Sequence, residues 1–432
     1  MGKIDIHNFD KQLKEEIRRL KESSISDKNK EIILKFVKEV SISESPSKST
    51  KLKYYQVPRT IVKRYLDNKD LDSLSQEDLR ELKFKIYNSS NFKGWTKQKF
   101  GGIIKKLFTW LKYDLSWLKT TVKRNEKSKV KAADILTEEE VKALIQNADT
   151  PRDKAFISML YELGSRISEI GNMKIKDITK SKHGYILDIE GKTGHRTPIL
   201  IMSIPYLTSW LNEHPLKDNP EAPLWVYRDY EEDSNANKKL PKKDRKKIIV
   251  YKHLTYNALK KIVKSTARKS GIKKRIYCHL FRHSRPTHLL KEGKITEAQA
   301  KVYFGWSPDS NMLSTYSHLI SSDVNKALLQ ANGIIEKEES EKQGLSPKKC
   351  PRCQELNKFD AKYCEKCFSF LDLKTALEID DKVRFYERFV EVLAKEINLE
   401  IEKDAEFRNL IFEKVFNKPV IENMLSKLKD KQ

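Results

Sequence analysis

The stretch TPRDKAFISMLYELG, residues 150–164, carries the signals of a helix from its first residue to its last. Thr150 is a good N-cap, Pro151 suits the first helical position, and Gly164 suits a left-handed turn at the end, so both helix ends are specified. The apolar positions between them follow helical spacing: Phe156, Met159, Leu160 and Leu163. The stretch predicts a buried helix, with Arg166 at the turn just beyond it.

Helical patterns continue on both sides of this segment. Residues 1–125 carry apolar side chains at helical spacing, as in EIILKFVKEV and FGGIIKKLFTWL, and Ser75 followed by Asp78 marks a helix start. The basic, apolar-poor segment 119–134 then predicts a charged linker. Two capping boxes mark later helix starts: Thr137 with Glu140, and Thr296 with Gln299.

Strand-like alternation occurs in YILDIEGKTGHRTPILI, residues 185–201. The two short runs around Gly191–Arg196 predict a β-hairpin with Lys192 at its turn. The polar and charged stretch 228–250 is instead typical of a mobile surface loop.

Charge restricts the class of partner. The chain has 432 residues, 86 Lys and Arg against 61 Asp and Glu, a net charge of +25 and a pI near 9.5. A polyanion is the natural partner, either nucleic acid or an anionic membrane. The start MGKIDIHNFD has no apolar signal core, and apolar runs such as ILIMSIPYL (199–207) are too short to span a bilayer. We therefore expect a cytoplasmic protein.

Four of the five cysteines form two C-x-x-C pairs, Cys350 with Cys353 and Cys364 with Cys367. This spacing is typical of a metal site, and four thiolates form a closed tetrahedral set for a structural Zn²⁺. A redox C-x-x-C is the alternative, but no βαβ pattern surrounds either pair. Cys278 stands alone among apolar residues and is expected to be a packed core thiol.

The stretch CHLFRHSRPTHLL, residues 278–290, concentrates cationic and titratable groups beside apolar ones. His279, Arg282 and His283 follow the i, i+3, i+4 spacing and share a face if the stretch is helical. Guanidinium groups match phosphate geometry, so Arg282 with Arg166 predicts a phosphodiester site. Pro286 requires that the helix begin only about a turn earlier or that it kink.

Four segments together resemble the tyrosine recombinase (phage-type integrase) family. They are LGSRISEIGNMKIKDI (163–178), GKTGHRTPIL (191–200), HLFRHSRPTHLL (279–290) and YFGWSPDSNMLSTYSHL (303–319), all within a span of about 134–330. The resemblance implies an enzyme that cleaves and rejoins DNA through a 3′-phosphotyrosyl intermediate. It implies no cofactor for catalysis, so the zinc would be structural only.

The resemblance also implies site roles, carried over residue by residue. The catalytic set would be Arg166, Lys192, His279, Arg282, Trp306 and Tyr316, with Glu169 and His283 in support. Tyr316 would attack the phosphate, Lys192 would protonate the leaving oxygen, and His279 would act as base or hydrogen-bond donor. Lys182 and Arg196 are the alternatives for Lys192, and Trp306 is expected to serve mostly by packing.

The implied fold is mainly α. We expect an all-α core-binding domain (1–125), an α+β catalytic domain with a small antiparallel sheet (126–335), a four-cysteine zinc ribbon (345–371) and a C-terminal helical segment (372–432). Residues 322–333 would supply a helix that docks on a neighbouring protomer. A C-terminal stripe suggests packing within its own segment: Val383, Tyr386, Val390, Leu393 and Ile397.

Several functions stay open at this point. The implied partners are double-stranded DNA and three further copies of the chain, as a homotetramer with a dimer on each site, and no membrane. Integration or excision of a mobile element is favoured over Xer-like dimer resolution by the extra C-terminal part. A type IB topoisomerase is a chemical relative, and a non-catalytic zinc-ribbon regulator is the rival of a different class.

Overall fold

The computed structural model describes residues 4–121, 132–181, 184–191, 194–232, 247–291, 293–307, 310 and 345–371, with positions 388, 391, 392, 395 and 403. It divides into two compact units, residues 1–345 and 346–432. Lys182, Lys192 and Tyr316 lie outside the described residues, as do the expected helix at 322–333 and the C-terminal apolar stripe.

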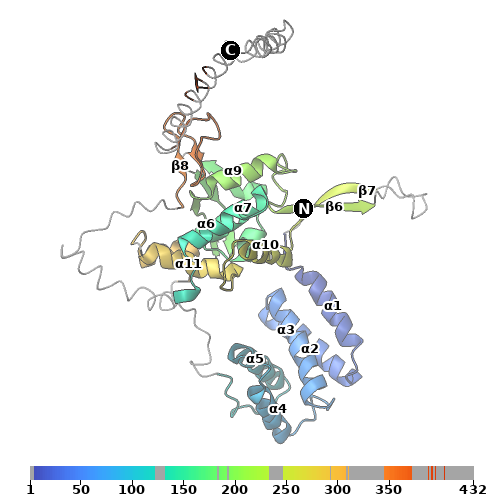
Figure 1. Ribbon diagram of the computed structural model, residues 1–432. Coiled ribbons are helices and arrows are strands. Elements are labelled where there is room, and N and C mark those ends of the chain that lie inside the picture. The colour runs from blue at the N-terminus through green and yellow to red at the C-terminus, as the bar shows by residue number, and fades with distance from the viewer. Residues whose placement is uncertain are drawn as a thin grey trace, which may run out of the picture. The chain divides into compact units, whose positions relative to one another are not determined.

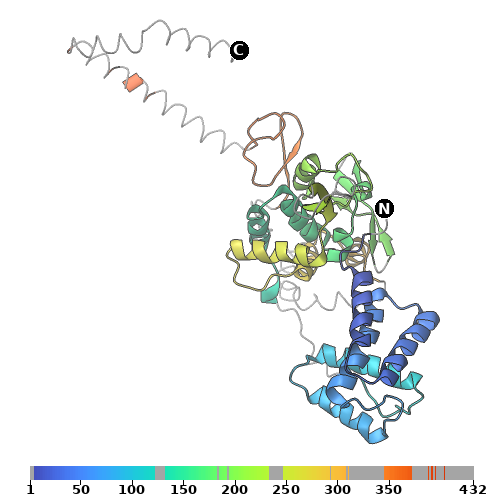
Figure 2. The same ribbon diagram turned by 90° about the vertical axis from the view of Figure 1, so that its right-hand side faces the viewer.

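Five helices form the N-terminal part of the first unit (Figure 1): α1 (Phe9–Lys21), α2 (Asp27–Glu44), α3 (Lys48–Tyr65), α4 (Gln76–Asn88) and α5 (Gly94–Trp110). The predicted capping box at Ser75 and Asp78 starts α4. The helices share a core of their own, which includes Leu20, Ile33, Phe36, Val37, Ile61, Leu82, Leu107 and Phe108. The turned view in Figure 2 shows these helices as one compact group. The all-helical prediction is confirmed for the described part of this region.

Helix α7 (Pro151–Leu163) is the central helix of the rest of the unit. The Thr150 hydroxyl accepts the Asp153 N–H at 3.1 Å, and Gly164 ends the helix at φ +50°, both as predicted. It packs against α6 (Glu138–Gln146), α9 (Ile204–Glu213) and α11 (Cys278–Lys291). Because α7 is covered on several sides, nearly every residue from Ala155 to Leu163 is buried.

Small antiparallel sheets follow α7 and α8 (Ile167–Gly171). A short 3₁₀ turn (Ile175–Asp177) leads into β1 (Ile178–Ser181), which pairs with β2 (Gly184–Leu187), and β2 pairs with β5 (Ile199–Leu200). Between them, β3 (Ile189–Gly191) pairs with β4 (Gly194–Arg196), with Ile189 opposite Arg196. The predicted hairpin is thus confirmed on both sides of its turn.

Glu162 connects α7 to the end of this sheet. Its buried carboxylate accepts the N–H groups of residues 201, 202 and 203 at 2.6, 2.9 and 2.8 Å. These donors lie where β5 gives way to α9, so one side chain joins α7, β5 and α9. Charge-assisted bonds of this kind are the strong ones in a protein interior.

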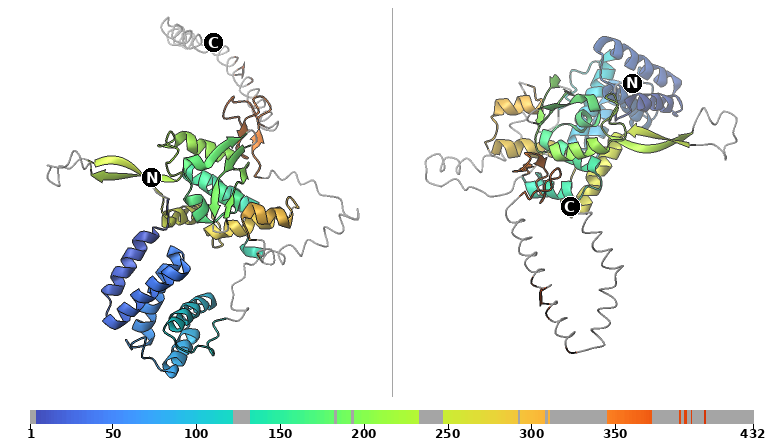
Figure 3. Two further views of the ribbon diagram at one scale, coloured as in Figure 1. Left: turned by 180° about the vertical axis from the view of Figure 1, so that it is seen from behind. Right: turned by 90° about the horizontal axis from the view of Figure 1, so that it is seen from above.

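The expectation of a loop over 228–250 is wrong at both of its ends. Strands β6 (Val226–Glu232) and β7 (Lys247–His253) form a two-stranded antiparallel ribbon, which extends away from the neighbouring helices in Figure 3. Lys252 Nζ lies 2.7 Å from both Asp229 and Glu231. Cross-strand pairing of this kind supports strands whose composition alone is typical of a loop.

Among the described residues of this unit, the remaining helices are α10 (Tyr256–Lys269) and α12 (Glu297–Phe304), and a 3₁₀ turn covers Ala132–Asp134. The capping boxes at Thr137 and Thr296 are present as predicted. In the second unit, β8 (Lys348–Lys349) pairs with β9 (Leu356–Asn357). Among the described residues, no helix has the length and apolarity needed to cross a bilayer. The helix-rich architecture with small antiparallel sheets confirms the predicted fold class.

Candidate active site

Arg166 and Glu169 form the first element of the site. Arg166 is the N-cap residue of α8, and its Nη1 donates to Glu169 Oε1 at 2.6 Å. The Glu169 carboxylate also accepts the Arg166 backbone N–H at 3.2 Å, in a capping-box arrangement. The Arg166 side chain keeps 32% of its surface exposed, so its guanidinium is oriented by Glu169 while remaining accessible.

Arg196, on β4, is the second cation on Glu169. Its Nη2 donates to Glu169 Oε2 at 3.0 Å and also to the Ser165 hydroxyl, and its Nη1 donates to the Tyr303 carbonyl. Burial would raise the pKa of Glu169, but the Arg166 hydrogen bond and the charges of Arg196, Arg166 and Arg282 hold that pKa below its usual range. Glu169 is therefore ionised near neutral pH.

Arg282, on α11, is the most buried guanidinium of the site, at 2% exposure. Its Nη1 donates to the Gly164 carbonyl at 3.0 Å and its Nη2 donates to the Phe304 carbonyl at 3.1 Å. One bond from each Nη fixes the direction in which the planar fork points. Arg282 thus joins the turn after α7 to the end of α12.

His279 and His283 lie one helical turn apart on α11, as the i, i+4 spacing predicted. Their rings meet edge to face with centroids 4.6 Å apart. Burial, with the charges of Arg282 and Arg166, lowers the pKa of His279. Burial, with His279 and Arg282 nearby, lowers the pKa of His283 to about 4. Both rings are therefore neutral near pH 7, and a neutral ring can accept or donate a proton.

Helix α11 begins at Cys278, about two turns before Pro286, so Pro286 lies inside the helix. The alternative that the helix begins only about a turn before Pro286 is wrong. The missing N–H of Pro286 removes a bond to the Arg282 carbonyl, four residues earlier. Hydroxyls of Ser284 and Thr287 bond the carbonyls of Leu280 and His283 at 2.9 Å on either side of this gap.

Trp306 follows α12 and is 7% exposed. Its ring stacks on Phe304 at a centroid distance of 5.4 Å, within a small cluster that includes Leu289 and Ala300. The expectation that Trp306 serves by packing agrees with this position.

Five of the eight predicted site residues therefore lie together: Arg166, Glu169, His279, Arg282 and His283. Trp306 lies beside them at the end of α12, and Lys192 and Tyr316 are outside the described residues. Arg196 stood in the sequence only as an alternative to Lys192. The hairpin pattern could have singled it out. Arg196 lies opposite the buried Ile189, and residues opposite each other on paired strands lie on the same face of the sheet.

A basic cavity of about 1010 Å³ opens beside Arg166 and His279. Its other cationic lining residues come from α10 and the following segment: Lys260, Lys261, Lys264, Arg268, Lys274 and Arg275. No carboxylate is among the described residues that line it. The cavity thus presents one sign of charge next to the arginine cluster, which favours an anionic ligand.

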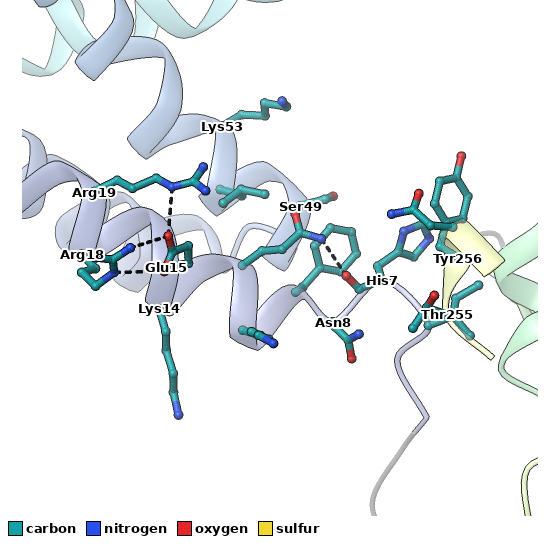
Figure 4. Close-up of a pocket in the computed structure, with 16 residues that line it drawn as sticks. His7, Asn8, Lys14, Glu15, Arg18, Arg19, Ser49, Lys53, Thr255 and Tyr256 are labelled. Atoms are coloured by element: carbon teal, nitrogen blue, oxygen red, sulfur yellow. Dashed lines mark hydrogen bonds and ion pairs between the residues drawn. The ribbon is translucent and has the colours of Figure 1, made fainter. Parts of the chain in front are cut away.

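A second cavity of about 840 Å³ lies where α1 and α3 face the start of α10 (Figure 4). Glu15 there pairs with Arg18 and Arg19, whereas Lys14 and Lys53 point away from the pair. His7, Tyr256 and Asn257 line both cavities, so the two are neighbours. The His7 ring stacks on Phe9 at a centroid distance of 4.9 Å and lies tilted against Tyr256 at 4.5 Å.

Comparison with known proteins shows what part of this chain is similar to. Residues 134–322 match the phage integrase family model. The tyrosine recombinase XerA of Pyrococcus furiosus is 30% identical over 203 residues, which cover 46% of this chain and 63% of that protein. Residues 134–322 thus resemble the phage integrase family, and the chain is similar to curated tyrosine recombinases.

Further known proteins are similar to this chain at lower identity. The tyrosine recombinase XerD of Staphylococcus aureus (strain Mu50) is 25% identical over 205 residues, covering 45% of this chain and 61% of that one. The chain therefore spans about three-fifths of the length of these curated relatives. Among solved structures, a XerH recombinase bound to its DNA substrate after cleavage covers 77% of this chain, with 18% identity and a TM-score of 0.47.

Four cysteines form a separate centre in the second unit. The Sγ atoms of Cys350, Cys353, Cys364 and Cys367 all lie within 4.8 Å of one another. Both knuckles share one backbone pattern, because Gln354 N–H and Phe368 N–H donate to the carbonyls of Cys350 and Cys364 at 3.0 Å. Tetrahedral Zn–S bonds require S···S separations of about 3.8 Å, so the set fits Zn²⁺.

The fifth cysteine, Cys278, is buried in the first unit, and burial raises its thiol pKa to about 11. It is thus a packed thiol, as its apolar neighbours predicted.

Proposed function

We propose that this protein is a site-specific DNA recombinase that cleaves and rejoins strands through a 3′-phosphotyrosyl intermediate. The observation that carries the proposal is the cluster of Arg166, Glu169, His279 and Arg282, in which Glu169 and Arg282 are buried and Arg166 and His279 border a cavity lined by cations. A cation cluster that one carboxylate only partly neutralises is suited to a phosphodiester. The names of the curated relatives, all tyrosine recombinases, support the same reaction.

In the proposed reaction, Tyr316 attacks the scissile phosphorus and its oxygen displaces the 5′-oxygen of the neighbouring nucleotide. The new P–O bond conserves the energy of the broken one, so the reverse attack by a 5′-hydroxyl rejoins a strand. Arg166 and Arg282 bind the non-bridging oxygens, where negative charge increases in the transition state. His279 exchanges a proton with the phosphate or with Tyr316, and Lys192 protonates the leaving 5′-oxygen.

Duplex DNA is the proposed substrate. The two neighbouring cavities provide lysines from α1, α3 and α10 along the sides of the site, which suits backbone phosphates on either side of the scissile one. Contacts of this kind release counterions, so affinity falls steeply with salt. We propose that a tetramer acts on paired sites, with a dimer on each. Integration or excision of a mobile element is the proposed use, in keeping with the phage integrases that name the family.

The test compares wild type with Tyr316→Phe on supercoiled plasmid in EDTA. Wild type is expected to relax the plasmid and to leave protein covalently attached to DNA on a denaturing gel, and Tyr316→Phe is expected to do neither. Tyr230→Phe is the matched control, because Tyr230 is 53% exposed on the β6–β7 ribbon and should behave as wild type. Binding by all three proteins without any adduct, even on nicked trapping substrates, would favour the non-catalytic regulator instead.

A further inference from the structure

Two buried guanidiniums bridge the same two backbone segments. Arg282 donates to the Gly164 carbonyl and to the Phe304 carbonyl, at 3.0 and 3.1 Å. Arg196 donates to the neighbouring residue of each segment, through the Ser165 hydroxyl and the Tyr303 carbonyl. The turn between α7 and α8 is therefore tied twice to the end of α12, once from α11 and once from β4.

Arg196 also bonds the carboxylate of the site. Its Nη2 lies 3.0 Å from Glu169 Oε2, while Arg166 Nη1 lies 2.6 Å from Glu169 Oε1. The carboxylate is thus held between two arginines, one on each oxygen. Gly191 packs closely behind it, since a Cβ at that position would lie 3.1 Å from Glu169 Oε1.

From these contacts we propose that Arg196 is a positioning residue of the recombinase site. It fixes Glu169, and through Glu169 the guanidinium of Arg166, and it holds the end of α12 against the turn that carries Arg166. The inference rests on the proposed function, because the groups it positions are those assigned to the phosphodiester.

Arg196 acts through these groups rather than on DNA. Its side chain is 9% exposed, and it lines neither of the two basic cavities. A lysine at this position would keep the positive charge. Its single ammonium group could not bond all three groups that the planar guanidinium reaches, which are a carboxylate, a hydroxyl and a carbonyl.

Arg152 provides a matched control. Its Nε donates to Asp153 and its Nη1 to the Val226 carbonyl, both at 2.8 Å, so it too joins a carboxylate and a backbone carbonyl. It lies at the first turn of α7, whereas the cluster lies beyond the last turn. The 13 residues of α7 separate them by about 20 Å.

The experiment compares wild type, Arg196→Lys and Arg152→Lys as full chains. In single-turnover reactions at saturating DNA, Arg196→Lys is expected to slow covalent adduct formation roughly 10- to 100-fold, the usual cost of a small misplacement of a catalytic group. Its DNA affinity should stay within about twofold of wild type. Arg152→Lys should form the adduct at the wild-type rate.

Hydrogen–deuterium exchange tests whether Arg196 holds these two segments together, and it does not require an active enzyme. Peptides from 164–171 and 297–307 should exchange faster in Arg196→Lys and unchanged in Arg152→Lys, since opened structure loses protection. Unchanged exchange in Arg196→Lys, or equal losses of rate in both variants, would overturn the positioning role. If wild type forms no adduct, the proposed function fails, and the exchange result alone decides whether Arg196 holds these segments.

Discussion

At the residue scale, the balance of charge explains why the cluster suits a phosphodiester. Arg166, Arg196 and Arg282 bring three positive charges to one ionised Glu169. The two histidines add none near pH 7, because burial lowers both pKa values. The surplus of about two positive charges exceeds the single charge of a phosphodiester and matches a pentavalent transition state with two. In the proposed reaction, the cluster would therefore stabilise the transition state more than the ground state.

His283 should make stability depend on pH. Its pKa is about 4 in the folded chain against 6.5 ordinarily, so the unfolded chain binds a proton that the folded one rejects. Stability therefore rises with pH between about 4 and 6.5 and falls on acidification. Between pH 7 and pH 5 this group should cost about 2 kcal/mol.

The measurement is urea unfolding of wild type and His283→Gln at both pH values. The difference between the two proteins isolates His283 from other groups that titrate, including His279, which faces it. The same loss of stability on acidification in both proteins would contradict the prediction.

At the scale of elements, the turn from α7 to α8 contributes both to the stability of the fold and to the geometry of the site. Gly164 ends α7 at φ +50°, its carbonyl accepts from Arg282, and the next two residues bond Arg196 and Glu169. One turn thus positions the guanidiniums of α8, β4 and α11 together. Because glycine has no Cβ, it adopts this left-handed conformation at little cost, and the chain can turn there.

Gly164→Ala is expected to destabilise the first unit by roughly 1 to 3 kcal/mol. The added Cβ would lie 2.8 Å from Phe304 Cε1, and the alanine would have to adopt the left-handed backbone conformation of Gly164. Gly102→Ala is the matched control, because nothing lies within 4 Å of its Cβ position inside α5, and it should stabilise by up to about 1 kcal/mol. Thermal melting should show a lower melting temperature for Gly164→Ala and a higher one for Gly102→Ala. A shift of both melting temperatures in the same direction would refute the argument.

At the scale of the whole molecule, two units carry separate chemistry. The arginine cluster and both basic cavities belong to residues 1–345, and the four cysteines belong to residues 346–432. The metal centre is therefore expected to support the fold of its own unit rather than the reaction.

We expect one Zn²⁺ per chain, lost in Cys364→Ser and retained in Cys278→Ser, whose cysteine is the one outside the cluster. Small zinc sites contribute folding energy directly, so strong chelators should unfold residues 346–371 and leave the melting of the first unit unchanged. Elemental analysis gives the zinc content and thermal melting gives the stability. A full zinc content in Cys364→Ser, or a first unit that melts earlier on chelation, would contradict this assignment.

Features that depend on neighbouring residues could be predicted from the sequence. The caps at Ser75, Thr137, Thr150 and Thr296, the end of α7 at Gly164 and the hairpin at 189–196 all depend on contacts within a few residues. The shared face of His279 and His283 and the two C-x-x-C knuckles are equally local. Such features follow from backbone preferences and short hydrogen bonds, which a sequence shows directly.

Contacts between segments far apart in the chain became visible only in the folded structure. Arg196 enters the site because β4 places it beside Glu169 and the end of α12, which are 27 and 107 residues away along the chain. Strands β6 and β7 were missed because each gains its stability from the other across the intervening residues. The carbonyl partners of Arg282 were equally hidden. In each case the deciding partner lies far along the chain, and packing rather than local preference brings it into contact.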